Sequence, residues 1–146
     1  FQRTYFEHLA LAAETGLFDT LGHPDLVKNV APEAWDVTRL MDVICDSLDR
    51  IAAAGTAMEL NTSGLNKAIP EMNPGPQILA QMQQRGIPVV IGADAHKPER
   101  VGADFVAALD QLSAAGYSKV SNFLDRQRLD YPIERARASL TAARDS

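Results

Sequence analysis

A carboxylate and an imidazole with the spacing of metal ligands follow the most apolar segment of the chain. Asp94 and His96 come directly after residues 87–91, IPVVI, in the string GADAHK. Two such side chains, two positions apart, can point toward one site, and this hard-to-borderline donor pair suits Zn²⁺, Mn²⁺ or Fe. His23 follows an earlier apolar segment, between a glycine and a proline. Together the three side chains predict a metal site, although Asp94 alone could cap a following helix and His23 alone could be a packed residue.

Basic and polar side chains stand near these candidates in the sequence. Residues 61–67, NTSGLNK, offer hydroxyls and amides and end in Lys67, while Lys97 and Arg100 come directly after the candidate ligands. Because Lys and Arg side chains bind phosphate oxygens, we expect these three to bind the phosphate of a substrate. The alternative is a turn with solvated surface cations. Glu59 lies inside an apolar run, TAMEL, and is a further candidate for contacting substrate or supporting a ligand.

Helical and strand patterns alternate along the chain. Apolar residues three and four apart predict helices, and short apolar runs between them predict strands. This alternation predicts right-handed βαβ units, a parallel sheet and one α/β domain over 1–146, as an open doubly wound sheet or part of a (β/α) barrel. The candidate residues follow strands, and the carboxyl ends of parallel strands share one edge. The expected helices cover 3–15, 36–54, 74–85, 99–115 and 133–146, and the expected strands cover 17–21, 56–60, 87–91 and 118–123. We expect Asp36 to cap the second helix and Gly55 to end it, and Val101 to be buried in the fourth. The apolar face of the second helix is formed by Leu40, Ile44, Leu48 and Ile51.

Composition and charge exclude several functional classes. The chain has 146 residues, of which 46% are hydrophobic and 23% charged, and its net charge is -5. An acidic chain disfavours binding to nucleic acid or to a membrane surface, and no apolar run approaches the roughly 18 residues of a membrane span. Cys45 is the single cysteine, so it forms no internal disulfide. We therefore expect a cytoplasmic protein.

Three strings in a fixed order carry a resemblance to a known family. They are GHPDLVK at 22–28, ELNTSGLNK at 59–67 followed later by NP, and IPVVIGADAHKPERVG at 87–102. With these strings, residues 6–128 resemble the second half of histidinol-phosphatases of the PHP (polymerase and histidinol phosphatase) family. The resemblance implies a distorted, TIM-like (β/α)7 barrel with a trinuclear metal site at its carboxyl-terminal rim. It also implies hydrolysis of L-histidinol phosphate to L-histidinol and phosphate in histidine biosynthesis.

Carried over by position, the resemblance makes His23 the histidine of the family's G-H-x-D motif and Asp94 and His96 its closing D-x-H, all three of them metal ligands. It also assigns the basic residues named above to the substrate phosphate. The family's opening H-x-H, a further histidine and a glutamate ligand belong to an amino-terminal half that this sequence does not contain. We therefore expect residues 1–146 to be a partial PHP domain, truncated at the amino terminus. Two alternatives remain: another PHP-type phosphoesterase, and a non-catalytic fragment or module without the full metal site.

Overall fold

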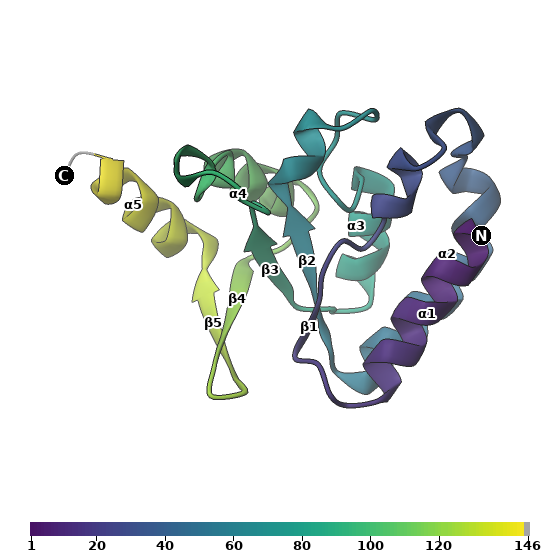
Figure 1. The fold of residues 1–146 in the computed structure, drawn as a ribbon. Coiled ribbons are helices and arrows are strands. Elements are labelled where there is room, and N and C mark those ends of the chain that lie inside the picture. Colours follow the sequence, from purple (N-terminus) through teal and green to yellow (C-terminus); the bar gives the residue numbers. More distant parts are fainter. Residues whose placement is uncertain (145–146) are drawn as a thin grey trace.

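A three-stranded parallel sheet lies at the middle of the protein in the computed structural model, which describes residues 1–144 (Figure 1). The strands are β1 (Thr20–Leu21), β2 (Ala57–Asn61) and β3 (Val89–Gly92), hydrogen-bonded in that order. Both pairings are parallel, and Glu59 stands opposite Val90 in the register. The apolar side chains of β2 are buried, as expected for a parallel strand with helices packed around it. The predicted mixed α/β fold is therefore confirmed.

Amphipathic helices connect the strands and cover the sheet. α1 and α2 pack side by side next to β1, and α5 lies at the far end of the molecule (Figure 1). The face of α2 predicted to be apolar is buried, and Gly55 ends this helix with φ 72°, a conformation that glycine adopts at little cost. The helix bounds are α1 Gln2–Glu14, α2 Val37–Ala54, α3 Pro76–Gln84, α4 Phe105–Ala114 and α5 Ile133–Arg144.

Asp36 begins α2 as an N-cap, as the sequence predicts. Its carboxylate accepts hydrogen bonds from the backbone N–H groups of Thr38 at 3.0 Å and Arg39 at 3.2 Å. We expect Asp36→Ala to lower the free energy of unfolding by about 1 kcal/mol, because two helical N–H groups lose their acceptor. Urea unfolding of this variant beside Asp46→Ala, an exposed carboxylate in the same helix, measures the effect. An equal loss in both variants would contradict the capping role.

Two predicted elements are shorter than expected. The strand predicted over 17–21 is reduced to β1, because pairing with β2 begins only at Thr20, opposite Ala57. Leu17 and Phe18 are instead 68% and 50% exposed. For the helix predicted over 99–115, the predicted first residue is wrong. The chain forms a short 3-10 helix, η4 (Pro98–Arg100), and α4 begins only at Phe105.

Left-handed backbone explains the late start of α4. Gly102 and Asp104 have φ values of 70° and 62°, and a right-handed helix cannot pass through such residues. Val101, predicted to be buried in this helix, is 76% exposed.

The carboxyl-terminal strand does not extend the parallel sheet. β4 (Lys119–Leu124) pairs antiparallel with β5 (Gln127–Pro132), a strand that the sequence pattern did not predict. Asp125 and Arg126 form the two-residue turn with φ values of 50° and 62°, which match the twist of a hairpin. Among residues 1–144 the hairpin and the three-stranded sheet are separate sheets, and no closed barrel is formed. The predicted final helix is present as α5, whereas positions 145–146 of that prediction lie outside the described residues.

Within the described part of the chain, no helix combines the length and the apolar character needed to cross a membrane.

Candidate metal and phosphate site

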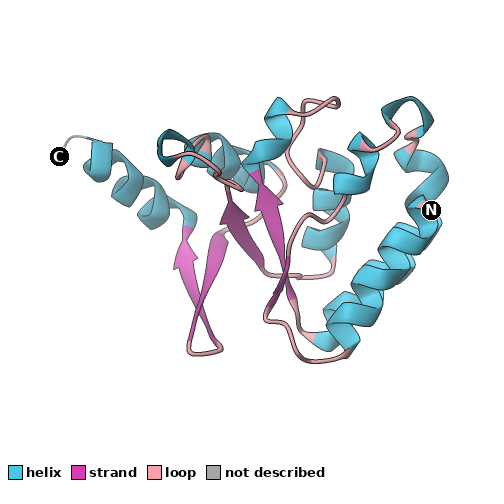
Figure 2. Cartoon of the chain, viewed as in Figure 1, coloured by secondary structure: helices cyan, strands magenta, loops and turns pink. Residues whose placement is uncertain are grey.

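The loops that follow the three parallel strands lie at one edge of the sheet, where Figure 2 shows short helices and loops. His23 comes two residues after β1, and Asp94 comes two residues after β3. A 3-10 helix, η3 (Thr62–Asn66), directly follows β2 between them. The parallel topology therefore brings the candidate ligands and the NTSGLNK segment to the same edge, the usual place of ligand sites in α/β folds.

His23 and Asp94 share an uncommon backbone conformation. Their φ values are 52° and 46°, in the left-handed region that few residues other than glycine occupy. Such conformations cost roughly 1–3 kcal/mol and cluster at functional sites, where the surrounding structure holds them. Two of the three predicted ligands, His23 and Asp94, thus lie in a sharp backbone turn immediately after a strand.

Three side chains hold His23. The Glu59 carboxylate accepts the His23 backbone N–H at 2.9 Å, and its Oε2 also lies 3.5 Å from His23 Nδ1. The Asn61 amide nitrogen lies 3.3 Å from the same ring nitrogen. The Tyr5 hydroxyl donates to the His23 backbone carbonyl. Burial, followed by the nearby Asp25 carboxylate, raises the pKa of Tyr5 to about 12, so the hydroxyl stays a donor at neutral pH.

Asp94 and His96 contact each other and face solvent. His96 Nδ1 lies 2.8 Å from the Asp94 carbonyl oxygen and 3.8 Å from its carboxylate, and the His96 side chain is 82% exposed. The alternative that Asp94 caps a following helix is wrong, because the N-cap residues of η4 and α4 are Lys97 and Asp104. Across residues 1–144, no three His, Cys, Asp or Glu side chains form a group that could hold a metal. The structure thus pairs Asp94 with His96, and His23 with Glu59.

The three basic candidates flank this edge. Lys67 ends η3, and Lys97 precedes η4; both are exposed. Arg100 is half-buried and donates to the Asp104 carboxylate at 3.2 Å. Lys67 and Lys97 are therefore accessible to an anion from solvent, whereas Arg100 is already paired.

A buried ion network beside His23 was missed by the sequence analysis. Lys28, in the 3-10 helix η1 (Leu26–Asn29), is completely buried and donates to Asp25 at 3.0 Å, to Glu71 at 2.9 Å and to the Met72 carbonyl at 3.0 Å. Asp25 also accepts the Gly75 N–H at 2.8 Å. Burial raises the pKa of Asp25 above its usual value, although the Lys28 ammonium opposes this shift. The sequence signal for this network is the spacing of Asp25 and Lys28, two opposite charges three residues apart in GHPDLVK.

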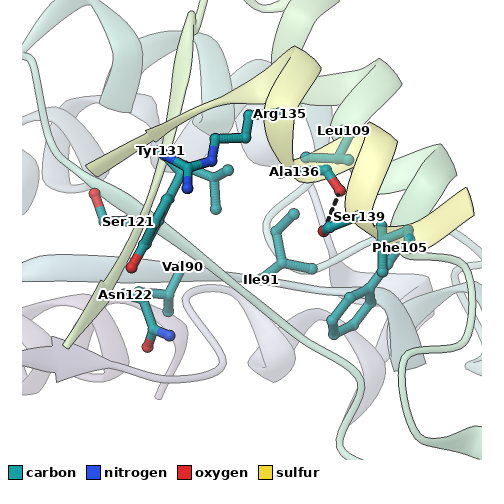
Figure 3. A pocket seen from close by; sticks show the side chains of 12 residues that line it. Val90, Ile91, Phe105, Leu109, Ser121, Asn122, Tyr131, Arg135, Ala136 and Ser139 are labelled. Atoms are coloured by element: carbon teal, nitrogen blue, oxygen red, sulfur yellow. Dashed lines mark hydrogen bonds between the residues drawn. The ribbon is translucent and has the colours of Figure 1, made fainter. Parts of the chain in front are cut away.

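A cavity of about 520 Å³ lies away from this edge, between β3, α4, the hairpin and α5 (Figure 3). Most of its lining is apolar and includes Val90, Ile91 and Leu109. Arg135 lies over the Tyr131 ring, 5.8 Å from its centre. None of the six predicted site residues lines this cavity.

A parallel α/β sheet with imidazole, carboxylate and basic side chains beyond its strand ends is typical of metal-dependent α/β enzymes. The chain is similar to a curated protein of Deinococcus radiodurans named "Probable histidinol-phosphatase", with 36% identity over 114 residues. That match covers 78% of this chain and 42% of the relative. The chain thus spans less than half the length of the curated relative it matches.

Solved structures give the same result for the fold. Histidinol phosphate phosphatase from Lactococcus lactis, solved with zinc, L-histidinol and phosphate, matches with a TM-score of 0.72 and 18% identity, over 88% of this chain and 50% of the other. A protein from Listeria monocytogenes assigned as a histidinol phosphatase matches with a TM-score of 0.63 and 25% identity, over 73% of this chain and 43% of the other. No protein-family model matches the chain. The resemblance to histidinol-phosphatases is confirmed by these similarities.

Proposed function

We propose that this chain is part of a metal-dependent phosphomonoesterase that hydrolyses L-histidinol phosphate to L-histidinol and phosphate. The observation that carries the proposal is the 36% identity to the Deinococcus protein over 114 residues, joined to candidate ligands at the ends of parallel strands. The Lactococcus neighbour, which was solved with zinc, L-histidinol and phosphate, supports the same substrate class. We also propose that residues 1–146 are one partial PHP domain of a (β/α)7 barrel, acting in the cytoplasm in histidine biosynthesis.

His23, Asp94 and His96 are the residues that would hold divalent metal. Their imidazole and carboxylate donors fit Zn²⁺, Mn²⁺ or Fe. A trinuclear site needs more protein ligands than these three, and the family's further ligands would supply them. Bound divalent metal would lower the pKa of a coordinated water and polarise the phosphoryl oxygens.

The chain's own basic side chains would act on the phosphate. Lys67 and Lys97 face solvent at the same edge as the candidate ligands, and their ammonium groups would balance the charge of phosphoryl oxygens. Arg100 would join them if its pairing with Asp104 opened. These residues would therefore orient the ester and offset its charge, while the left-handed turns aim the metal-binding side chains.

A substrate panel tests the proposal against the two alternatives. Phosphate release by a protein that joins this chain to the family's amino-terminal half would be measured from L-histidinol phosphate, p-nitrophenyl phosphate, AMP and a 3′-phosphorylated oligonucleotide, with Zn²⁺ or Mn²⁺ present. The proposed function predicts the highest kcat/KM for L-histidinol phosphate. A preference for another ester would favour a different phosphoesterase, and no release from any ester would favour a non-catalytic module.

A further inference from the structure

Glu59 occupies an unusual position for a carboxylate. It lies in the middle of β2, the central strand of a parallel sheet, and its side chain is only 16% exposed. The described residues give it no Lys or Arg partner; its neighbours are the backbone and ring of His23. A largely buried carboxylate without a Lys or Arg partner is costly, so its presence at this place calls for a role.

Two glycines make the space that this carboxylate fills. A Cβ atom at Gly92, on the neighbouring strand β3, would collide with Glu59 Oε1. A Cβ atom at Gly22 would lie 3.3 Å from Glu59 Oε2. Neither glycine has a positive φ, so space and not backbone conformation explains the absence of a side chain there. The carboxylate therefore sits in a slot, defined here by Gly22 and Gly92, between the β1 and β3 strand ends.

The contacts of Glu59 fix the conformation of His23. One carboxylate oxygen, Oε2, accepts the His23 N–H at 2.9 Å and lies 3.5 Å from the ring nitrogen Nδ1. The accepted N–H belongs to a residue with φ 52°, a conformation that needs support from its surroundings. A carboxylate behind a metal-binding imidazole commonly sets ring orientation and raises the basicity of the ligand.

We propose that Glu59 is a positioning residue that, from the slot, holds His23 in its left-handed, metal-binding conformation. The metal-binding role of His23 in this inference rests on the proposed function. The support that Glu59 gives to the conformation of His23 does not depend on that function. It also gives Gly92 a specific role, because a side chain there would displace the carboxylate.

Amide hydrogen exchange and zinc affinity of the whole chain test the proposal together. Glu59→Ala removes the acceptor and the charge, so we expect His23 amide exchange at least tenfold faster and zinc binding about 10–100-fold weaker. Glu59→Gln keeps an oxygen acceptor, so we expect the exchange rate of the His23 amide in this variant to stay within threefold of the wild-type rate. Because the charge is lost, zinc binding should still weaken about tenfold. Glu134→Ala, an exposed carboxylate in α5, is the control and changes neither.

Gly92→Ala supplies an independent arm, should Glu59→Ala fail to fold. It should accelerate His23 exchange in the wild-type background and have no further effect when combined with Glu59→Ala, since the collision is then gone. The proposal would be overturned if the exchange rate of the His23 amide were unchanged in Glu59→Ala or in Gly92→Ala. It would also be overturned if Glu59→Gln bound zinc with wild-type affinity. If the wild-type chain itself binds no zinc, the proposed metal site fails, and the exchange measurements alone decide the role of Glu59.

Discussion

Replacing Lys28 with methionine is expected to lower the free energy of unfolding by about 3–5 kcal/mol, because it leaves a buried carboxylate without its cation. Lys28 is completely buried and its ammonium donates to Asp25, to Glu71 and to the Met72 carbonyl. Methionine fills a similar volume, so the loss measures the charge and not a cavity. Urea unfolding at pH 7 provides the measurement, with the exposed Lys119→Met as control.

The loss in Lys28→Met should depend on pH in a defined direction. Burial already raises the pKa of Asp25 in the folded chain, and Lys28 is the cation that opposes this rise. Removing Lys28 therefore raises that pKa further. A folded carboxyl with a raised pKa binds its proton more tightly than the unfolded chain does, so stability falls as pH rises through the folded pKa. The deficit against wild type should be greatest at neutral pH and shrink toward the acid side.

A second substitution separates the charge effect from misfolding. Neutralising the stranded carboxylate with Asp25→Asn in the Lys28→Met background should restore part of the lost stability. A loss below about 1 kcal/mol in Lys28→Met, or a deficit independent of pH, would contradict a buried ion pair at this place.

The second large effect concerns the candidate ligands. We expect His96→Ala to weaken zinc binding by more than about 100-fold, since even the loss of a group behind a ligand costs about 10–100-fold. The His96 side chain is 82% exposed, so its removal should change the free energy of unfolding by less than about 0.5 kcal/mol. His23→Ala and Asp94→Ala should weaken zinc binding equally strongly. Competition with a chelating dye measures the affinities.

His8 provides a matched control for these variants. It is an exposed histidine in α1, away from the strand ends, and His8→Ala should bind zinc as the wild type does. Equal affinities in wild type and His96→Ala would remove His96 from the metal site. Equal losses in His8→Ala and His96→Ala would indicate non-specific binding by surface imidazoles.

The strand ends could be located from the sequence because their signals are local. IPVVI is a β-branched apolar run, and it forms β3 followed by Asp94 and His96. Gly55 and Asp36 bound α2 as predicted, because capping depends on residues within one helical turn. The candidate ligands therefore lie after parallel strands, where the alternation of helices and strands predicts them.

What the sequence did not reveal depends on contacts between distant segments. Glu59 and Gly92 are 33 positions apart, and only the register of β2 and β3 places the carboxylate beside the glycine. Lys28 meets Glu71 across 43 positions, and the nearby Asp25, three residues away, does not by itself predict that Lys28 is buried. β5 is mostly exposed and polar, and pairing with β4 through a tight turn, not an apolar pattern, makes it a strand.

Phosphate release from L-histidinol phosphate before and after chelation, by a protein that joins this chain to the family's amino-terminal half, tests the central claim most directly. We predict release in the presence of Zn²⁺, its loss after treatment with EDTA, and its return when Zn²⁺ is added back. Because His96→Ala is expected to bind zinc more than about 100-fold more weakly, the added metal should not restore release in that variant at the same concentration. Release that persists after chelation, or no release with any divalent metal, would contradict a metal-dependent phosphatase built on His23, Asp94 and His96.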